Sequence, residues 1–398
     1  MKLTDYNRIQ LFAFFLTASL LYIAGCKGNE GKKLQDTIDS ISVAHVSDSR
    51  IGICNLIIST SADRKIIISG ETTDPSVRDD LFNTLDKEGI KFIDSILFLP
   101  DTISNKLFQG LVTLSVTNLR KEPDHASELV SQARLGTPVT ILKSEGAWLL
   151  IQTPDKYIAW TEGSSVTKMT TTEIKAWNRS ERVIYLENTG WIFASRGNEG
   201  VISDVVAGSI LQNAGESGGF VKVALPDGRT GYLPSGSLMD FTNWKYAQSV
   251  NTDDICIRAA SMLGIPYLWG GTSTKGADCS GYVQTVYFLN GYILQRDASL
   301  QALHGESIDL SDNFKNLLPG DLLFFGPTRN GKPRVTHVGI YKGSMEYIHS
   351  SGMVNINSLD SSKANFSGPR LKLLLMAKRI VGASTGEGIV AVKDHPLY

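Results

Sequence analysis

The chain has 398 residues, of which 42% are hydrophobic and 20% are charged, and its 39 basic and 40 acidic residues give a formal net charge of −1 at pH 7. This balance argues against a nucleic-acid-binding protein and against a polybasic membrane-surface patch, and the apolar share is that of a folded protein. At about 150 residues per domain, the length predicts two to four domains.

Residues 1–25 have the pattern of a bacterial signal peptide. Basic residues precede an apolar run from Leu11 to Ile23, which is shorter than the about 20 residues that span a bilayer. The run ends in Ile23-Ala-Gly-Cys, which resembles a bacterial lipobox. The resemblance implies that Cys26 becomes the lipidated first residue of the exported protein. The alternative is a plain signal peptide in which Cys26 has no special role.

Residues 26–107 are expected to form a small α+β domain behind a polar, Gly- and Lys-rich tether at residues 27–35. Asp74-Pro75 supplies a cap and a first-turn proline for a helix. The predicted elements are a helix over residues 76–87 and strands over residues 56–59, 65–69 and 91–99. This domain shows no catalytic group of residues.

Two divergent copies of one small-barrel pattern follow, at residues 108–172 and 173–245. Short strands with turn signals recur in both, and Gly146-Ala-Trp-Leu-Leu-Ile-Gln is similar to Gly219-Phe-Val-Lys-Val-Ala. The pattern predicts two small β-barrels, which resemble bacterial SH3-type modules. Such modules either bind the cell wall or serve only as walls and spacers for the domain that follows.

Cys279 follows a glycine-rich segment and stands at the predicted start of a helix. The residues after it show apolar i, i+3, i+4 spacing, and Asp278 and Ser280 suit a first turn. Unpaired N–H groups and partial positive charge at a helix start favour a thiolate and can stabilise an oxyanion. The sequence therefore predicts a nucleophile with a lowered pKa. If Cys26 is lipidated, three cysteines remain, and an odd count leaves a free thiol.

A base for this nucleophile is predicted from two histidines. Residues 335–341 and 346–349 read as neighbouring strands, and with a three-residue loop between them His337 would face His349 directly. A four-residue loop would put the two imidazoles on opposite faces. Cys279, a base and a histidine that orients the base make a nucleophilic set. Because their spacing matches no compact zinc pattern, we expect neither a metal nor another cofactor.

Five motifs stand in one order along residues 250–380. They are Pro266-Tyr-Leu-Trp-Gly-Gly, Asp278-Cys-Ser-Gly-Tyr, Gly320-Asp-Leu, His337-Val-Gly-Ile-Tyr and Tyr347-Ile-His. They resemble the NlpC-type cysteine peptidases, papain-like enzymes that cut peptidoglycan stem peptides. Together with the SH3-type modules, the arrangement resembles the γ-D-glutamyl-L-diamino-acid endopeptidases. The fold class that follows is multidomain, with an α+β papain-like catalytic domain over residues 246–398 preceded by two SH3-like β-barrels and a small α+β domain.

The resemblance implies roles for four residues in the reaction. Cys279 is the nucleophile, His337 the general base and His349 the residue that orients this base. The hydroxyl of Tyr267 points at the oxyanion. The residues implied to bind the substrate are Asp278, Ser280, Arg296 and Ser299 in the catalytic domain, and Glu128 and Tyr157 in the first barrel.

The implied binding residues divide by the part of the substrate that they contact. Asp278 anchors a free N-terminal amine, and Ser280 hydrogen-bonds the substrate. Arg296 and Ser299 line the γ-D-glutamyl pocket. Glu128, together with Tyr157, contacts the first alanine, so that the first barrel closes the cleft.

We therefore predict a cysteine endopeptidase that hydrolyses the γ-D-glutamyl–diamino acid bond of murein peptides with a free N-terminal L-alanine, in peptidoglycan peptide recycling. One alternative is a hydrolase that acts on stem peptides of intact peptidoglycan, and another is a non-catalytic wall-binding lipoprotein. The expected partners are the L-Ala-γ-D-Glu-diamino acid peptide and a membrane reached through the lipid at Cys26. We expect no nucleic acid, a monomer, and a place in the periplasm or on the outer face of the cell.

Overall fold

The computed structural model describes residues 28–102, 107–246, 251–383, 386 and 388–398. The predicted signal peptide and Cys26 lie outside the described residues. The chain divides into two compact units, Met1–Asp101 and Thr102–Tyr398. Within the described ranges, no helix is both long and apolar enough to cross a bilayer.

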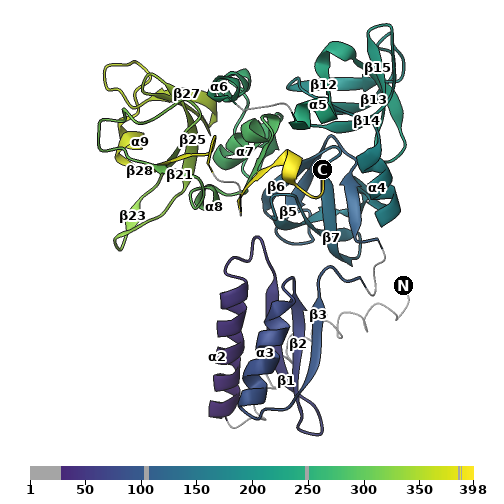
Figure 1. The fold of residues 1–398 in the computed structure, drawn as a ribbon, viewed down its shortest axis with the longest axis vertical. Coiled ribbons are helices and arrows are strands. Elements are labelled where there is room, and N and C mark those ends of the chain that lie inside the picture. Colours follow the sequence, from purple (N-terminus) through teal and green to yellow (C-terminus); the bar gives the residue numbers. More distant parts are fainter. Residues whose placement is uncertain (1–27, 103–106, 247–250, 384–385, 387) are drawn as a thin grey trace, which may run out of the picture. The chain divides into compact units, whose positions relative to one another are not determined.

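The first unit has a three-stranded sheet with two helices on one face (Figure 1). Its elements are α2 (Gly28–His45), β1 (Cys54–Thr60), β2 (Ile66–Thr72), α3 (Ser76–Lys87) and β3 (Phe92–Phe98). Strand β1 is antiparallel and β3 parallel to β2. Helix α3 has the predicted bounds, but the predicted tether is wrong, because residues 28–35 begin α2. Leu34, Ile38 and Ile41 form a helical stripe there that packs into the core of the unit.

The second unit begins with two seven-stranded sheets. The first contains β4 (Gln109–Val112), β5 (Val116–Arg120), β6 (Leu129–Arg134), β7 (Pro138–Glu145), β8 (Trp148–Gln152), β9 (Ile158–Glu162) and β10 (Val166–Met169). The second contains β11 (Arg182–Tyr185), β12 (Thr189–Phe193), β13 (Val201–Val206), β14 (Ile210–Ser217), β15 (Phe220–Ala224), β16 (Thr230–Pro234) and β17 (Leu238–Asp240).

The two sheets repeat one topology. When the strands are counted from the first strand of each sheet, both run in the order 7-1-4-5-6-2-3. A helix follows each sheet, α4 (Thr171–Arg179) after the first and α5 (Phe241–Tyr246) after the second. Trp177 of α4 and Trp244 of α5 are buried in one shared core cluster. The predicted repeat is therefore present in strand order, and a helix with a buried tryptophan follows each sheet.

The third part of this unit is built on a six-stranded antiparallel sheet in the order β21-β28-β22-β25-β26-β27. These strands are β21 (Glu306–Ile308), β22 (Leu322–Phe325), β25 (His337–Gly343), β26 (Glu346–Ser351), β27 (Met353–Ser358) and β28 (Leu374–Arg379). The helices are α6 (Thr252–Ser261), α7 (Cys279–Leu289), α8 (Ala298–Gln301) and α9 (Gly368–Lys372). Short strand pairs are β18 (Thr272–Ser273) with β19 (Gly276–Ala277), β20 (Tyr292–Leu294) with β29 (Ile389–Ala391), and β23 (Thr328–Arg329) with β24 (Lys332–Pro333).

Helix α7 is the centre of this part of the molecule. Every residue of α7 except Gln284 is buried, as expected for a helix that is covered on all sides. One side packs with β22, β25 and β26 in the largest core cluster. Near its end, Phe288 joins Trp177 and Trp244 in the core shared with the barrels. The helix that begins at Cys279 is thus held by both the sheet and the barrel modules.

Candidate active site

Cys279 is the first residue of α7, as predicted, and Asp278 caps the helix. The Asp278 carboxylate accepts the N–H of Gly281 at 2.7 Å. A Cβ at Gly281 would lie 2.0 Å from the carbonyl oxygen of Gly271. Glycine at this position is what lets the preceding glycine-rich loop approach the helix start. The first turn of α7 therefore lies directly against that loop.

The thiol of Cys279 is buried, with 8% of the residue exposed. Backbone N–H groups of Val338 and Ser280 lie within hydrogen-bonding reach of it and act to lower its pKa. Burial and the charge of Asp278 outweigh them and raise the pKa of Cys279 to about 11. The predicted lowered pKa is therefore wrong for the substrate-free protein, because desolvation is a larger effect here than the helix N-terminus.

His337 and His349 lie side by side. Nε2 of His337 is 2.7 Å from Nδ1 of His349, and the two rings are nearly perpendicular. The prediction that the two imidazoles are neighbours on one face is confirmed, but His337 does not face His349 directly across the two strands. Ile340 faces Ile348, and β25 carries an irregularity at Lys342 before the turn.

This register places Gly339 opposite His349, and His337 reaches His349 diagonally from the same face. A Cβ at Gly339 would lie 3.1 Å from Cβ of His349, so the glycine leaves room for the imidazole. The turn itself contains two residues with positive φ, Ser344 at 54° and Met345 at 63°. A two-residue turn plus one extra strand residue thus keeps both histidines on one face.

A third polar residue completes the histidine chain. Oδ1 of Asn357 lies 2.7 Å from Nε2 of His349, and the Asn357 amide donates to the Asn365 carbonyl at 3.1 Å. The amide group is therefore oriented so that its oxygen accepts from His349. The sequence analysis did not predict a role for Asn357. The available signal was a polar residue on the strand that follows His349, where it can lie beside the histidine.

Burial holds both imidazoles neutral. It lowers the pKa of His337 to about 2, with the charges of His349 and Arg370 adding to it, and lowers that of His349 to about 4. A neutral imidazole has one donor and one acceptor nitrogen. Since Nε2 of His349 donates to Asn357, its Nδ1 accepts from Nε2 of His337. Nδ1 of His337 is then the unprotonated nitrogen that can act as a base.

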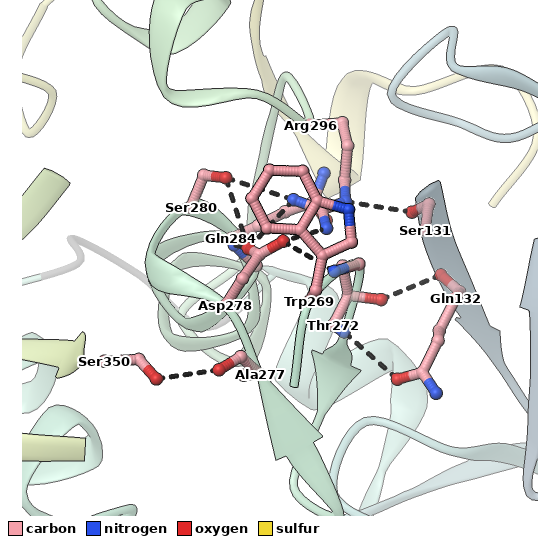
Figure 2. A network of polar contacts seen from close by, with 12 residues as sticks. Ser131, Gln132, Trp269, Thr272, Ala277, Asp278, Ser280, Gln284, Arg296 and Ser350 are labelled. Atoms are coloured by element: carbon pink, nitrogen blue, oxygen red, sulfur yellow. Dashed lines mark hydrogen bonds and ion pairs between the residues drawn. The ribbon is translucent and has the colours of Figure 1, made fainter. Parts of the chain in front are cut away.

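Asp278 and Ser280, which flank Cys279 in the chain, belong to a polar network built on a buried ion pair (Figure 2). Nη1 and Nη2 of Arg296 donate to the two oxygens of Asp278 at 3.1 and 2.5 Å. The Asp278 oxygens also accept N–H groups of Gly270 and Gly281, and Ser280 donates to Asp278 and accepts from Arg296. Burial acts to lower the pKa of Arg296, but Asp278 outweighs it and holds this pKa above its usual value.

The first barrel reaches this network directly, as Figure 2 shows for Ser131 and Gln132. Nε of Arg296 donates to Ser131 at 3.1 Å. Oε1 of Gln132 accepts the N–H of Thr272 at 3.1 Å, and the Thr272 hydroxyl donates to the Gln132 carbonyl at 2.8 Å. Strand β6 therefore supports the hairpin that leads to Cys279.

Glu128, at the edge of the same strand, contacts the loop before Cys279. Its Oε1 accepts the indole N–H of Trp269 at 2.9 Å, and the residue is exposed. Tyr157 is buried in the first barrel, close enough to Arg296 to affect its pKa. Two parts of the chain about 140 residues apart thus form one surface beside the nucleophile.

The remaining candidates lie nearby. Burial, together with the charges of Cys279 and Asp278, raises the pKa of Tyr267 to about 12, which keeps its hydroxyl protonated as a donor. Ser299 is half-buried on α8, three residues after Arg296. Among the described residues, no group of three or more His, Cys, Asp or Glu side chains could hold a metal ion.

The chain is similar to known proteins. Residues 264–368 match the profile of the NlpC/P60 family, and residues 115–167 match that of the bacterial SH3 domain. The chain is 30% identical to dipeptidyl-peptidase 6 of Lysinibacillus sphaericus over 264 residues. This aligned region covers 63% of this chain and 92% of that protein. This chain belongs to the NlpC/P60 family. It is a cysteine peptidase of this peptidoglycan endopeptidase family, with a bacterial SH3 domain.

A further relative and a solved structure agree with the assignment. A γ-D-glutamyl-L-lysine dipeptidyl-peptidase of Bacillus subtilis (strain 168) is 28% identical over 228 residues, which cover 55% of this chain and 71% of that protein. The solved structure of an NlpC/P60 family protein from Bacillus cereus ATCC 10987 matches with a TM-score of 0.60 at 22% identity and covers 69% of this chain and 99% of that one. The structural likeness extends the shared fold beyond the catalytic sheet.

Proposed function

We propose that this NlpC/P60 peptidase hydrolyses the bond between γ-D-glutamate and the diamino acid in murein peptides with a free N-terminal L-alanine. The observation that carries the proposal is the exposed carboxylate of Glu128, which the first barrel holds on the loop before Cys279 through Trp269. A carboxylate there suits an ammonium group on the substrate. Two relatives that are named γ-D-glutamyl-L-lysine dipeptidyl-peptidase support the same cleavage.

The proposed reaction begins at the thiol of Cys279. Nδ1 of His337 takes the thiol proton as sulfur attacks the γ-carbonyl carbon of D-glutamate. The Cys279 backbone N–H and the Tyr267 hydroxyl donate to the oxyanion. His337 then gives its proton to the departing amine of the diamino acid, which leaves a thioester. Water, deprotonated by His337, attacks the thioester carbonyl; the C–S bond breaks, the dipeptide is released as the acid, and His337 returns the proton to the sulfur of Cys279.

His349 and Asn357 serve this reaction through His337. Nδ1 of His349 accepts from Nε2 of His337 and so stabilises the imidazolium that forms during the reaction. Asn357 keeps a proton on the opposite nitrogen of His349. The pair thus directs Nδ1 of His337 to the reacting atoms.

The other proposed contacts lie on the dipeptide side. Glu128 has a second carboxylate oxygen with no partner among the described residues, whereas the Asp278 oxygens are already occupied by N–H donors. Glu128 is therefore proposed as the main receptor of the ammonium, with Asp278 adding negative charge. The further proposed contacts to alanine and γ-D-glutamate are Tyr157, Ser280, Arg296 and Ser299.

We also propose the domain organisation and the anchoring. The second seven-stranded sheet is taken as a second SH3-type barrel because it repeats the strand order of the first. The proposed domains are a signal peptide (1–25), a small α+β domain (26–107), two barrels (108–172 and 173–245) and the peptidase domain (246–398).

Membership of a family of cell-wall hydrolases supports an envelope location, with a lipid on Cys26 as the proposed anchor and a monomer as the proposed state. Mass spectrometry of the mature N-terminus tests the lipid, and an unmodified Cys26 would exclude it.

The decisive experiment uses three peptides of one sequence: free L-Ala-γ-D-Glu-diamino acid, its N-acetylated form and its muramyl-linked form. Loss of the ammonium should cost roughly 2–5 kcal/mol, because a charge-assisted pair is left without its partner. That free energy corresponds to about thirtyfold to several thousandfold in kcat/KM. Products identified by mass spectrometry should be the dipeptide and the diamino acid. Equal rates on the free and muramyl-linked peptides would instead support hydrolysis of intact peptidoglycan.

A further inference from the structure

Arg370 lies beside the two histidines and has no role in the reaction described above. It belongs to the short helix α9 and is half-buried. Its Nη2 donates to the hydroxyl of Ser351 at 3.2 Å. Ser351 ends β26, two residues after His349 on the same face of the sheet, and the register of β25 with β26 continues to place it opposite His337.

Arg370 has no carboxylate partner among the described residues. The ion pairs among the described residues include none to Arg370, whereas Arg296 pairs with Asp278 and Arg379 pairs with Asp321. The Arg370 guanidinium nevertheless lies close enough to act on both histidines and lowers the pKa of each. A cation there opposes formation of the imidazolium that the reaction needs. An anion that arrives with the substrate would remove this opposition.

The position of Arg370 also indicates which part of the substrate it meets. Glu128 and the Asp278–Arg296 pair are the groups proposed to hold the dipeptide. His337 delivers its proton to the departing amine, so groups beyond His337 face the leaving residue. In an α-amino acid, the carbon that carries this amine also carries the α-carboxylate. A donor near His337 can therefore reach that carboxylate.

We propose that Arg370 is a specificity residue that binds the α-carboxylate of the departing diamino acid. This inference rests on the proposed function. An arginine suits the task because its N–H groups match the two oxygens of a carboxylate. The enzyme then favours a peptide whose diamino acid is C-terminal and free over one in which that carboxyl group is an amide. Binding also neutralises Arg370 and makes proton transfer to His337 easier.

The test compares L-Ala-γ-D-Glu-L-Lys with its C-terminal amide, because lysine carries no second carboxylate. We expect the wild-type enzyme to prefer the free acid by about 10- to 100-fold in kcat/KM, as for the loss of a hydrogen bond to a charged group. Arg370→Gln should lower the rate on the acid without lowering the rate on the amide, so that the preference approaches one. Arg370→Lys should restore part of it. Lys372→Gln is the matched control, because it removes an exposed positive charge from the same helix and should leave the preference unchanged.

The outcomes separate the two proposals. Equal wild-type rates on acid and amide, or an unchanged preference in Arg370→Gln, would overturn the role of Arg370 while leaving the cleavage site in place. Failure of the wild-type enzyme to cut either peptide would overturn both. A pH profile of kcat/KM is a further test, because a purely structural role of Arg370 would leave the profile unchanged. Removing the charge of Arg370 should shift the acid limb of kcat/KM to higher pH, and an unchanged limb in a folded variant would contradict its electrostatic contact with His337.

Discussion

The two polar networks that meet at Cys279 differ in how completely their groups are paired. On one side, both oxygens of Asp278 accept from the Arg296 guanidinium and from backbone N–H groups. In the histidine chain, Asn357 fixes the proton of His349 on Nε2, and His349 in turn fixes the proton of His337 on Nε2. Nδ1 of His337 therefore stays unprotonated and can act as a base. A saturated buried network holds position, whereas an unsaturated nitrogen at the end of an oriented chain can move a proton.

The largest effect is expected at the atom that both networks position. Cys279→Ala should abolish hydrolysis of the tripeptide, because the acyl group then has no sulfur to bind, while the fold remains. The measurement is product formation together with a circular dichroism spectrum of the variant. Turnover that persists in folded Cys279→Ala would rule out covalent catalysis.

The saturated side should respond in stability. Arg296→Met leaves the buried Asp278 carboxylate without its counter-ion and should lower the free energy of unfolding by about 3–5 kcal/mol. Denaturant unfolding of the protein measures this loss. Arg329→Met, at an exposed position on β23, is the control and should change stability by less than about 0.5 kcal/mol. If the two variants have similar free energies of unfolding, the Asp278–Arg296 pair does not stabilise the fold as proposed.

Changes in the chain from Asn357 to His337 should affect the catalytic rate. Asn357→Ala removes the acceptor that keeps the proton on Nε2 of His349, so kcat should fall by about 10- to 100-fold with little change in KM. Asn357→Asp keeps an acceptor and should recover much of the rate. Single-turnover kinetics on the tripeptide separate this effect from binding. If the alanine variant keeps the wild-type kcat, the tautomer of His349 is set by something other than Asn357.

The contribution of the first barrel should be smaller and confined to binding. Glu128→Gln keeps an acceptor for Trp269 but removes the main charge proposed to meet the ammonium. Because the negative charge of Asp278 remains, KM for the free tripeptide should rise by only about tenfold, less than the effect of losing the ammonium itself. The control is Glu122→Gln, an exposed carboxylate in the same hairpin of the barrel. Steady-state kinetics of both variants decide the matter. An equal change in the two variants would count against a specific contact at Glu128.

The smallest effect is expected in the pH profile. Because burial lowers the pKa values of His337 and His349, both imidazoles stay neutral below pH 6.5, and the base remains available there. The acid limb of kcat/KM should therefore lie at lower pH than the ordinary value of a histidine. Asn357→Asp adds a negative charge beside His349 and should move this limb up by about one pH unit. A wild-type limb at or above pH 6.5 would show that the histidines are not desolvated in the working enzyme.

Local sequence signals predicted much of this molecule. The helix at Cys279 was predictable because Asp278, Ser280 and an apolar stripe all indicate the same start. The repeat of the two barrels was visible in short similar segments. Helix α2 was missed because its first residues are polar and Gly-rich, and its apolar stripe becomes a helix signal only from Leu34 onward.

Other features required the assembled structure. The pairing of His337 with His349 depends on a two-residue turn and an extra residue at Lys342, and a hairpin sequence alone leaves the register open. The part played by Asn357 depends on a neighbouring strand.

The sequence by itself determined which side chains stand at the start of α7 and on strands β25 and β26, because caps and periodicity act over a few residues. Only the tertiary structure decided their electrostatic state and their partners. Burial raises the pKa of Cys279 and lowers that of His337, and this desolvation comes from packing against elements far along the chain. The contact of Glu128 with Trp269 has the same origin, since it joins residues 141 positions apart that meet only when the first barrel packs against the β18–β19 hairpin and helix α7.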